Sequence, residues 1–179
     1  MRKLFFLLVV LSLNFISPYS YAEEAQTHFA LSTTAFLDKG ILPVLYTCDG
    51  KDISPQLEWI NVPANTKTFA LIFSDIDPPD GTFYHWVVFN IPVSTTSFDQ
   101  GIEKLPSGSV AGINDFKNLK YNGPCPPKGS AHTYVFTLYA LDTKLTLKEG
   151  ANAKSVLDAM QNHMLGQAQL TTVYSRWIQ

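Results

Sequence analysis

Two histidines lie in frames of proline and glycine, and they are the residues of this chain best suited to bind a ligand. Asp75-Ile-Asp-Pro-Pro-Asp leads to His85-Trp86, and Gly123-Pro-Cys-Pro-Pro-Lys-Gly129 leads to His132-Thr-Tyr134. Each histidine precedes an apolar run that could form a buried strand, so both imidazoles are expected at strand ends, where scaffolds often present binding groups. If these ends meet, the two rings form a small pocket for an anion.

Two carboxylates, Asp75 and Asp77, follow the apolar run 69–73 at the point where a strand gives way to a turn. Their spacing would place them on one face if the strand continued, and Pro79 belongs to a proline pair that fixes the turn backbone. An aspartate could orient an imidazole and leave its second nitrogen to a ligand, whereas Asp77 could instead only cap the loop. A purely structural role remains the alternative for each histidine.

The loop 123–129 could contribute backbone contacts to the same pocket. Gly123 and Gly129 permit close approach of the backbone, and the remaining N–H groups could bind an anion as a nest, although prolines remove several donors. On a strand, Tyr134 shares a face with His132, so both side chains could donate to phosphate oxygens.

Residues 1–22 predict a cleavable export signal. Arg2 and Lys3 precede an apolar run from Leu4 to Leu13, and Ala22 completes a site of the kind that a signal peptidase recognises. The alternative of a membrane anchor is disfavoured, because roughly 20 apolar residues are needed to span a bilayer. We therefore expect cleavage after Ala22, a periplasmic or secreted protein, and no stable membrane span.

The remaining residues, 23–179, are expected to form one domain. They include 11 basic and 15 acidic residues, a formal charge of −4, which excludes a general nucleic-acid binder. Both cysteines, Cys48 and Cys125, lie in this part, and an oxidising compartment favours a disulfide between them. A free Cys125 is the alternative, and it would be the only candidate thiol nucleophile.

Prolines and glycines at short intervals predict many short strands, at 30–32, 57–59, 68–74, 86–91, 133–141 and 171–176. Helical periodicity is convincing only from Asn152 to about Gln169, and Asn152 could cap the helix. The count favours a mainly β domain, a two-sheet sandwich with peripheral helices.

These segments together resemble the phosphatidylethanolamine-binding protein family, specifically its bacterial, Raf-kinase-inhibitor-like branch. The resemblance spans nearly all of 23–179. It includes Tyr46-Thr-Cys-Asp-Gly, Ser54-Pro-Gln-Leu-Glu-Trp, the two histidine frames, Asn114-Asp115 and Leu138-Tyr-Ala-Leu-Asp. It implies a β-sandwich with a large sheet, a smaller sheet and flanking helices.

The resemblance also implies a pocket that holds phosphate, acetate, cacodylate or phosphorylated head groups. Its ligand-binding residues would be Asp75, His85, Pro126, His132 and Tyr134. Secondary candidates are Asp77, Pro79, Trp86, Gly123, Cys125 and Gly129. Two positions depart from the family pattern, because Ile76 stands where proline is usual and Thr133 stands where arginine is common. Loss of that cation should weaken the hold on a dianion if the arginine reaches the pocket.

Three functions remain open at this point. The favoured one is non-catalytic binding of a small anion or a phosphorylated group, with Asp75 orienting a histidine because a free carboxylate would repel phosphate. The alternative, which the family name suggests, is a secreted inhibitor of a protease or another partner protein.

A hydrolase that uses Asp75 with His85, or with His132, as an acid–base pair is less favoured, because no Gly-x-Ser-x-Gly nucleophile motif occurs. No cofactor is expected. The spacing of Asp75, Asp77, His85 and His132 gives no support to a metal site.

Overall fold

A computed structural model describes residues 28–176, so the predicted signal peptide and its cleavage site lie outside the described residues. The elements in chain order are β1 (Ala30–Ser32), β2 (Gly40–Ile41), the 3-10 helix η1 (Val44–Tyr46), β3 (Leu57–Ile60), β4 (Thr68–Asp75), β5 (Phe83–Pro92), β6 (Ser97–Phe98), β7 (Val110–Ala111), β8 (Ala131–Leu141), α1 (Ala153–Met160) and β9 (Met164–Ser175). Within 28–176, no helix has the length and apolar character needed to cross a membrane.

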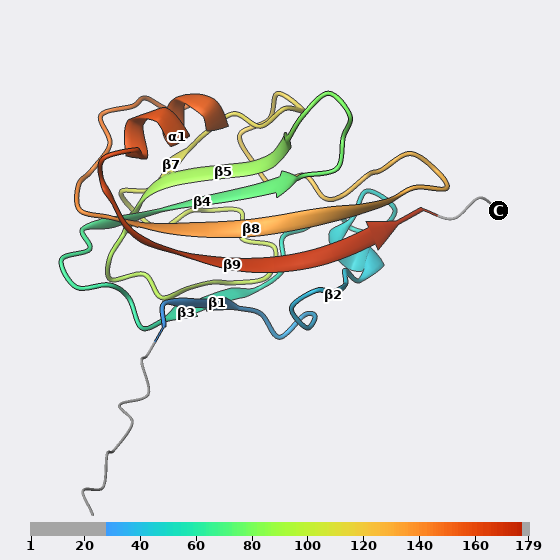
Figure 1. The fold of residues 1–179 in the computed structure, drawn as a ribbon, viewed down its shortest axis with the longest axis horizontal. Coiled ribbons are helices and arrows are strands. Elements are labelled where there is room, and N and C mark those ends of the chain that lie inside the picture. The colour runs from blue at the N-terminus through green and yellow to red at the C-terminus, as the bar shows by residue number, and fades with distance from the viewer. Residues whose placement is uncertain (1–27, 177–179) are drawn as a thin grey trace, which may run out of the picture.

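The strands form two sheets, which confirms the predicted mainly β sandwich. The small sheet has the order β1-β3-β6, and the large sheet has the order β2-β9-β8-β4-β5-β7. Neighbouring strands are antiparallel except for the short parallel pair β2 and β9. In Figure 1 the large sheet runs between α1 on one side and β1 and β3 on the other.

Strand β4 lies at the centre of the large sheet and is buried at all eight positions. Because successive side chains point to opposite faces, its residues serve two cores. Phe69, Leu71 and Phe73 pack in the core between the two sheets. Ala70 and Ile72 pack in a second core with residues of α1. The large sheet is therefore covered on both faces, which explains why β4 is apolar at almost every position.

The predicted C-terminal helix is correct in its first half only. Asn152 caps α1 as expected, since its side chain accepts a hydrogen bond of 2.8 Å from the Ser155 N–H. The helix ends at Met160, however, and the residues from Met164 onward form β9. This strand pairs with β8 at eleven positions, and the backbone hydrogen bonds of that ladder override the local helical periodicity.

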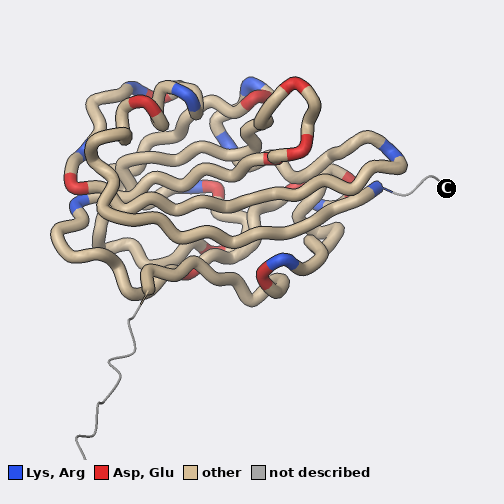
Figure 2. The backbone as a smooth tube through the Cα atoms, in the orientation of Figure 1, with Lys and Arg blue, Asp and Glu red and all other residues tan. Residues whose placement is uncertain are grey.

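The topology brings three strand ends to one edge of the large sheet. The last residue of β4, Asp75, pairs with Phe83 near the start of β5 and with Tyr134 near the start of β8. His85 and His132 lie close to these two starts, so the predicted meeting of the histidine frames is confirmed. Figure 2 shows that charged residues lie mainly in loops and at strand ends, whereas the central strands carry almost none.

Candidate functional site

A cavity of about 240 Å³ opens at this edge of the large sheet. Its lining combines titratable groups with prolines and aromatic rings: Asp75, Pro78, Pro79, Phe83, His85, Phe116, Cys125, Pro126, Pro127 and His132. Three larger hollows, of about 310, 350 and 700 Å³, contain neither histidine. The smaller cavity is therefore the candidate site, because convergent polar groups in an apolar pocket mark a binding site better than size does.

Asp75 orients His132. The Nδ1 atom of His132 lies 2.7 Å from Oδ2 of Asp75, and the two side chains are only 14% and 6% exposed. The other carboxylate oxygen of Asp75 accepts the N–H of Asp77 at 3.1 Å. Since a carboxylate is acceptor-only, Nδ1 of His132 carries the proton and Nε2 is left for another partner.

His85 is oriented by a backbone carbonyl instead. Its Nδ1 lies 2.8 Å from the Asn122 carbonyl oxygen, which can only accept, so Nδ1 carries a proton here too. Burial lowers the pKa of His85 below its ordinary value of 6.5, and this outweighs the opposing effects of the Asn122 carbonyl and the negative charge of Asp75. The ring is therefore neutral at pH 7, with Nε2 as a hydrogen-bond acceptor.

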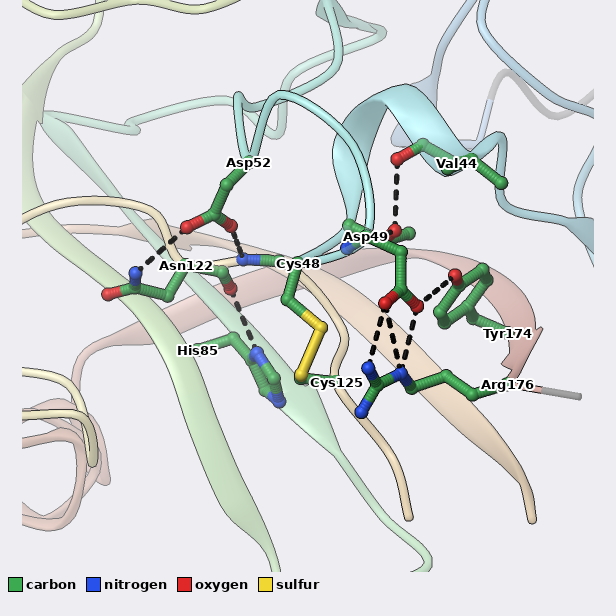
Figure 3. Close-up of a disulfide and its surroundings, with 11 residues drawn as sticks. Val44, Cys48, Asp49, Asp52, His85, Asn122, Cys125, Tyr174 and Arg176 are labelled. Carbon is green, nitrogen blue, oxygen red and sulfur yellow. Dashed lines mark hydrogen bonds and ion pairs between the residues drawn. A yellow bond between two sulfur atoms is a disulfide. The ribbon is translucent and has the colours of Figure 1, made fainter. Parts of the chain in front are cut away.

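A second layer of hydrogen bonds fixes the segment that holds His85 (Figure 3). The Asn122 side chain donates to Asp52 at 3.2 Å, and Asp52 also accepts the N–H of Gly123. Asn114 donates to the backbone oxygen of His85 and to the side-chain oxygen of Asn122, each at 2.9 Å. Sequence reasoning missed Asp52 and Asn122, and the Asn114-Asp115 motif was the only available signal for this layer.

Gly123 has a steric role next to this layer rather than a role in the cavity lining. A Cβ atom at this position would lie 2.2 Å from the carbonyl oxygen of Tyr46. The two backbones approach so closely that only glycine fits. Gly129, whose φ is +85°, belongs to the turn before β8 and also lies outside the cavity lining.

The predicted disulfide joins Cys48 to Cys125, with sulfur atoms 2.05 Å apart and Cα atoms 5.4 Å apart. Cys125 lines the cavity beside Pro126 and Pro127. The Cys48 N–H also donates to the Pro124 carbonyl oxygen at 3.2 Å. The disulfide therefore fastens one wall of the cavity to the segment that follows η1, and it is compatible with an oxidising compartment.

Two phenylalanines that sequence reasoning did not single out enclose His85. The ring centroids of Phe83 and Phe116 each lie 5.3 Å from that of His85, in edge-to-face arrangements. They also contact each other, with centroids 4.9 Å apart. Phe116 is 41% exposed and comes from an irregular loop, where neither strand nor helix periodicity could mark it.

Tyr134 shares a face with His132, as predicted, but it is not among the residues that line the cavity. The side chain is fully buried, with ring centroids 5.4 Å from His85 and 6.4 Å from His132. Burial, reinforced by the negative charge of Asp75, raises the pKa of the phenol, so the hydroxyl stays protonated. Within residues 28–176 this hydroxyl has no hydrogen-bond partner.

The remaining predicted residues divide between the cavity and its supports. Pro79 and Pro126 line the cavity. Trp86 does not line it, because its ring packs in the core against Phe98 and Tyr121. Asp77 is exposed and accepts the Thr133 N–H at 2.6 Å, so it stabilises the turn.

The two departures from the family pattern lie next to each other. The N–H of Ile76 donates to the Thr133 carbonyl oxygen at 3.1 Å, a bond that proline could not make. Ile76 thus extends the pairing of β4 with β8 by one residue. Neither Ile76 nor Thr133 lines the cavity.

The described part of the chain has no cluster of three or more His, Cys, Asp or Glu side chains that could hold a metal ion.

Comparison with protein families gives a match to the model described as phosphatidylethanolamine-binding protein, over residues 32–175. The chain is 50% identical over 149 residues to a UPF0098 protein of Methanothermobacter thermautotrophicus, covering 82% of this chain and 98% of that relative. It is 39% identical over 133 residues to the UPF0098 protein YbhB of Escherichia coli K12, covering 71% and 84%.

Two solved structures resemble the fold. Escherichia coli YbcL, described as a new member of the mammalian PEBP family, superposes with a TM-score of 0.78 and 32% identity, covering 82% of this chain and 98% of YbcL. A putative PEBP homologue from Chlamydia trachomatis gives a TM-score of 0.77 and 34% identity, covering 83% and 97%.

Proposed function

The chain belongs to the phosphatidylethanolamine-binding protein family, and from this premise we propose that its pocket binds a small oxyanion or a phosphorylated group without catalysing a reaction. The observation that supports this most is the convergence of His85 and His132 on one cavity. Each ring is held through Nδ1, so each has Nε2 left for a ligand.

Tyr134 would support the two histidines rather than contact the ligand, because its side chain is fully buried and does not line the cavity. Its ring packs beside both imidazoles, with centroids 5.4 Å from His85 and 6.4 Å from His132, and helps to hold them in place. Asp75 is already engaged by His132 and by the Asp77 N–H, which favours an orienting role over direct contact with the ligand.

Binding is favoured over hydrolysis because the lining offers no activated nucleophile. The sulfur of Cys125 is bonded to Cys48 and is therefore not a thiolate. Asp75 pairs with His132, one of the two acid–base pairs considered for a hydrolase, so the preference for binding rests on the missing nucleophile. We also propose that the protein is exported to the periplasm or secreted, since the predicted signal and the disulfide agree on that destination.

Isothermal titration calorimetry with phosphoethanolamine and phenyl phosphate tests the binding proposal. The variant His132→Ala should bind at least about 10-fold more weakly than the wild type, because it removes one of two hydrogen bonds to a charged ligand. The matched control is His163→Ala, which removes a histidine paired with Asp142 on the surface, far along the chain from the cavity lining. Equal loss of affinity in both variants, or no binding to the wild type, would contradict the proposal.

A further inference from the structure

The pocket presents a hydrogen-bond acceptor where an anion would be expected to meet a donor. Nδ1 of His85 must carry a proton, because its partner is a carbonyl oxygen, and a neutral ring then has a lone pair on Nε2. A fully deprotonated oxyanion would place its own lone pairs against this atom. A ligand oxygen that carries a proton would instead donate a hydrogen bond to it.

The charges around His85 also disfavour a dianion. The negative charges of Asp75 and Asp115 act on the ring. Asp52 is linked to it indirectly, because Asp52 accepts a hydrogen bond from the side chain of Asn122, whose carbonyl oxygen binds His85. The protonated phenol of Tyr134 packs against the ring of His85, and His132 packs in turn against Tyr134. None of the residues that line the cavity is a lysine or an arginine.

The rest of the cavity lining is mostly apolar. Pro78, Pro79, Pro126 and Pro127 contribute no backbone N–H donors, and Phe83 and Phe116 present aromatic edges and faces. The part of a ligand that extends beyond the two histidines would therefore gain from an apolar or aromatic substituent, which such walls bind better than a hydrated one.

From these three features we propose that the pocket selects oxyanions that keep an acidic O–H and carry an apolar substituent. The monoanion of a phosphate or phosphonate monoester meets both conditions, and its O–H donates to Nε2 of His85. Sulfate monoesters and phosphodiesters carry the same single charge but have no such proton. The inference rests on the proposed function and specifies the ligand class, so that intact phospholipid head groups, which are diesters, are poor ligands.

Phenyl phosphate and phenyl sulfate form a matched pair for the test. Near pH 6 the sulfate is a monoanion without a proton, whereas about half of the phosphate is a monoanion that retains one. Calorimetry on the wild-type protein at about pH 6 should show the phosphate binding at least about 10-fold more tightly, the value of one hydrogen bond to a charged group. Methyl phenyl phosphate, a diester, should behave like the sulfate. Equal affinities for all three would overturn the inference.

The pH dependence gives a second, independent outcome. The affinity for phenyl phosphate should fall as the pH rises from about 6 to about 8, because the monoanion loses its remaining proton near pH 6 and becomes a dianion. An affinity that rises over this range would show that the site prefers the dianion and would contradict the inference.

His85→Asn keeps a donor for the Asn122 carbonyl but has no ring nitrogen at the Nε2 position. It should bind phosphate and sulfate with similar affinity, and retained discrimination would count against His85 as the acceptor. If circular dichroism shows that the variant is unfolded, the wild-type series decides alone. Binding of both esters without discrimination refutes only this inference, whereas absence of binding by every oxyanion at each pH refutes the proposed function itself.

Discussion

The Nδ1 atom of His132 lies 2.7 Å from Asp75 Oδ2 in a pair that is largely buried, with side-chain exposures of 14% and 6%. The chain contains a second pair of the same chemistry, His163 and Asp142, at 2.8 Å, but there both side chains are 45% and 44% exposed. Similar geometry in two environments separates the effect of burial from that of the hydrogen bond.

Removal of each histidine should therefore affect stability differently. His132→Ala leaves the carboxylate of Asp75 buried without its partner, which should lower the free energy of unfolding by about 3 kcal/mol. His163→Ala should change it by less than about 1 kcal/mol, because Asp142 is solvated. Urea denaturation of the two variants at pH 7 measures both values. A smaller loss for His132→Ala than for His163→Ala would show that the buried pair is not important for the fold.

The disulfide should support both stability and the cavity wall. Replacing Cys48 and Cys125 together with serine opens a link between residues 77 positions apart, and should reduce the free energy of unfolding by about 2–4 kcal/mol. Affinity for phenyl phosphate should fall as well, since Cys125 stands in the wall beside Pro126. Denaturation and calorimetry on the double variant measure the two effects. An unchanged affinity would mean that the wall keeps its position without the covalent link.

Phe116 should matter for ligand binding more than for folding. Phe116→Ala removes an aromatic side chain from the cavity wall. Because this side chain is already 41% exposed, the free energy of unfolding should change by about 1 kcal/mol or less. Affinity for phenyl phosphate should drop roughly 5-fold or more through loss of aromatic contact. Leu119→Ala is the control, because Leu119 is 44% exposed in the same loop but lines a different hollow. Equal affinities of the two variants would argue against an aromatic wall.

The lowered pKa of His85 should make stability depend on pH. The unfolded chain binds a proton at this residue near pH 6.5, whereas the folded chain does so only at lower pH. Stability is therefore lost as the pH falls from 6.5 through the pKa of the folded protein.

His85→Asn provides the reference for this effect, since asparagine does not titrate. The free energy of unfolding of the wild type, relative to that of His85→Asn, should decrease between about pH 7 and about pH 5. Denaturant titrations at several pH values measure this difference. A difference that stays constant or increases on acidification would be inconsistent with a buried, neutral His85.

The fold was largely predictable because buried strands leave a clear pattern. All six expected strands are present, and the eight buried residues of β4 explain why that run lacks polar alternation. The helix was overextended because Met164 and Leu165 continue its three- and four-residue spacing. From Ala168 onward, buried and less buried residues alternate, a period of two that indicates a strand paired with β8.

The site was predictable where turns and titratable residues coincide. Asp75, His85 and His132 stand beside prolines and glycines that mark strand ends, and the structure places all three in one cavity. Phe116 and Asp52 could not be found in this way, because loop residues become neighbours of the site only through long-range contacts. Trp86 was misplaced because its sequence position next to His85 implied a shared location. His85 is the extra residue of a β-bulge, since Phe73 pairs with Trp86 and Ser74 pairs with Tyr84, and the Trp86 ring packs in the core against Phe98 and Tyr121.

The most direct test of the account uses the four histidines of the chain as internal probes. Imidazole ¹⁵N resonances of the labelled protein can be followed during titration with phenyl phosphate near pH 6. The account predicts shifts for His85 and His132 at saturation, with His28 and His163 unchanged. Saturable binding that leaves the resonances of His85 and His132 unmoved would contradict it.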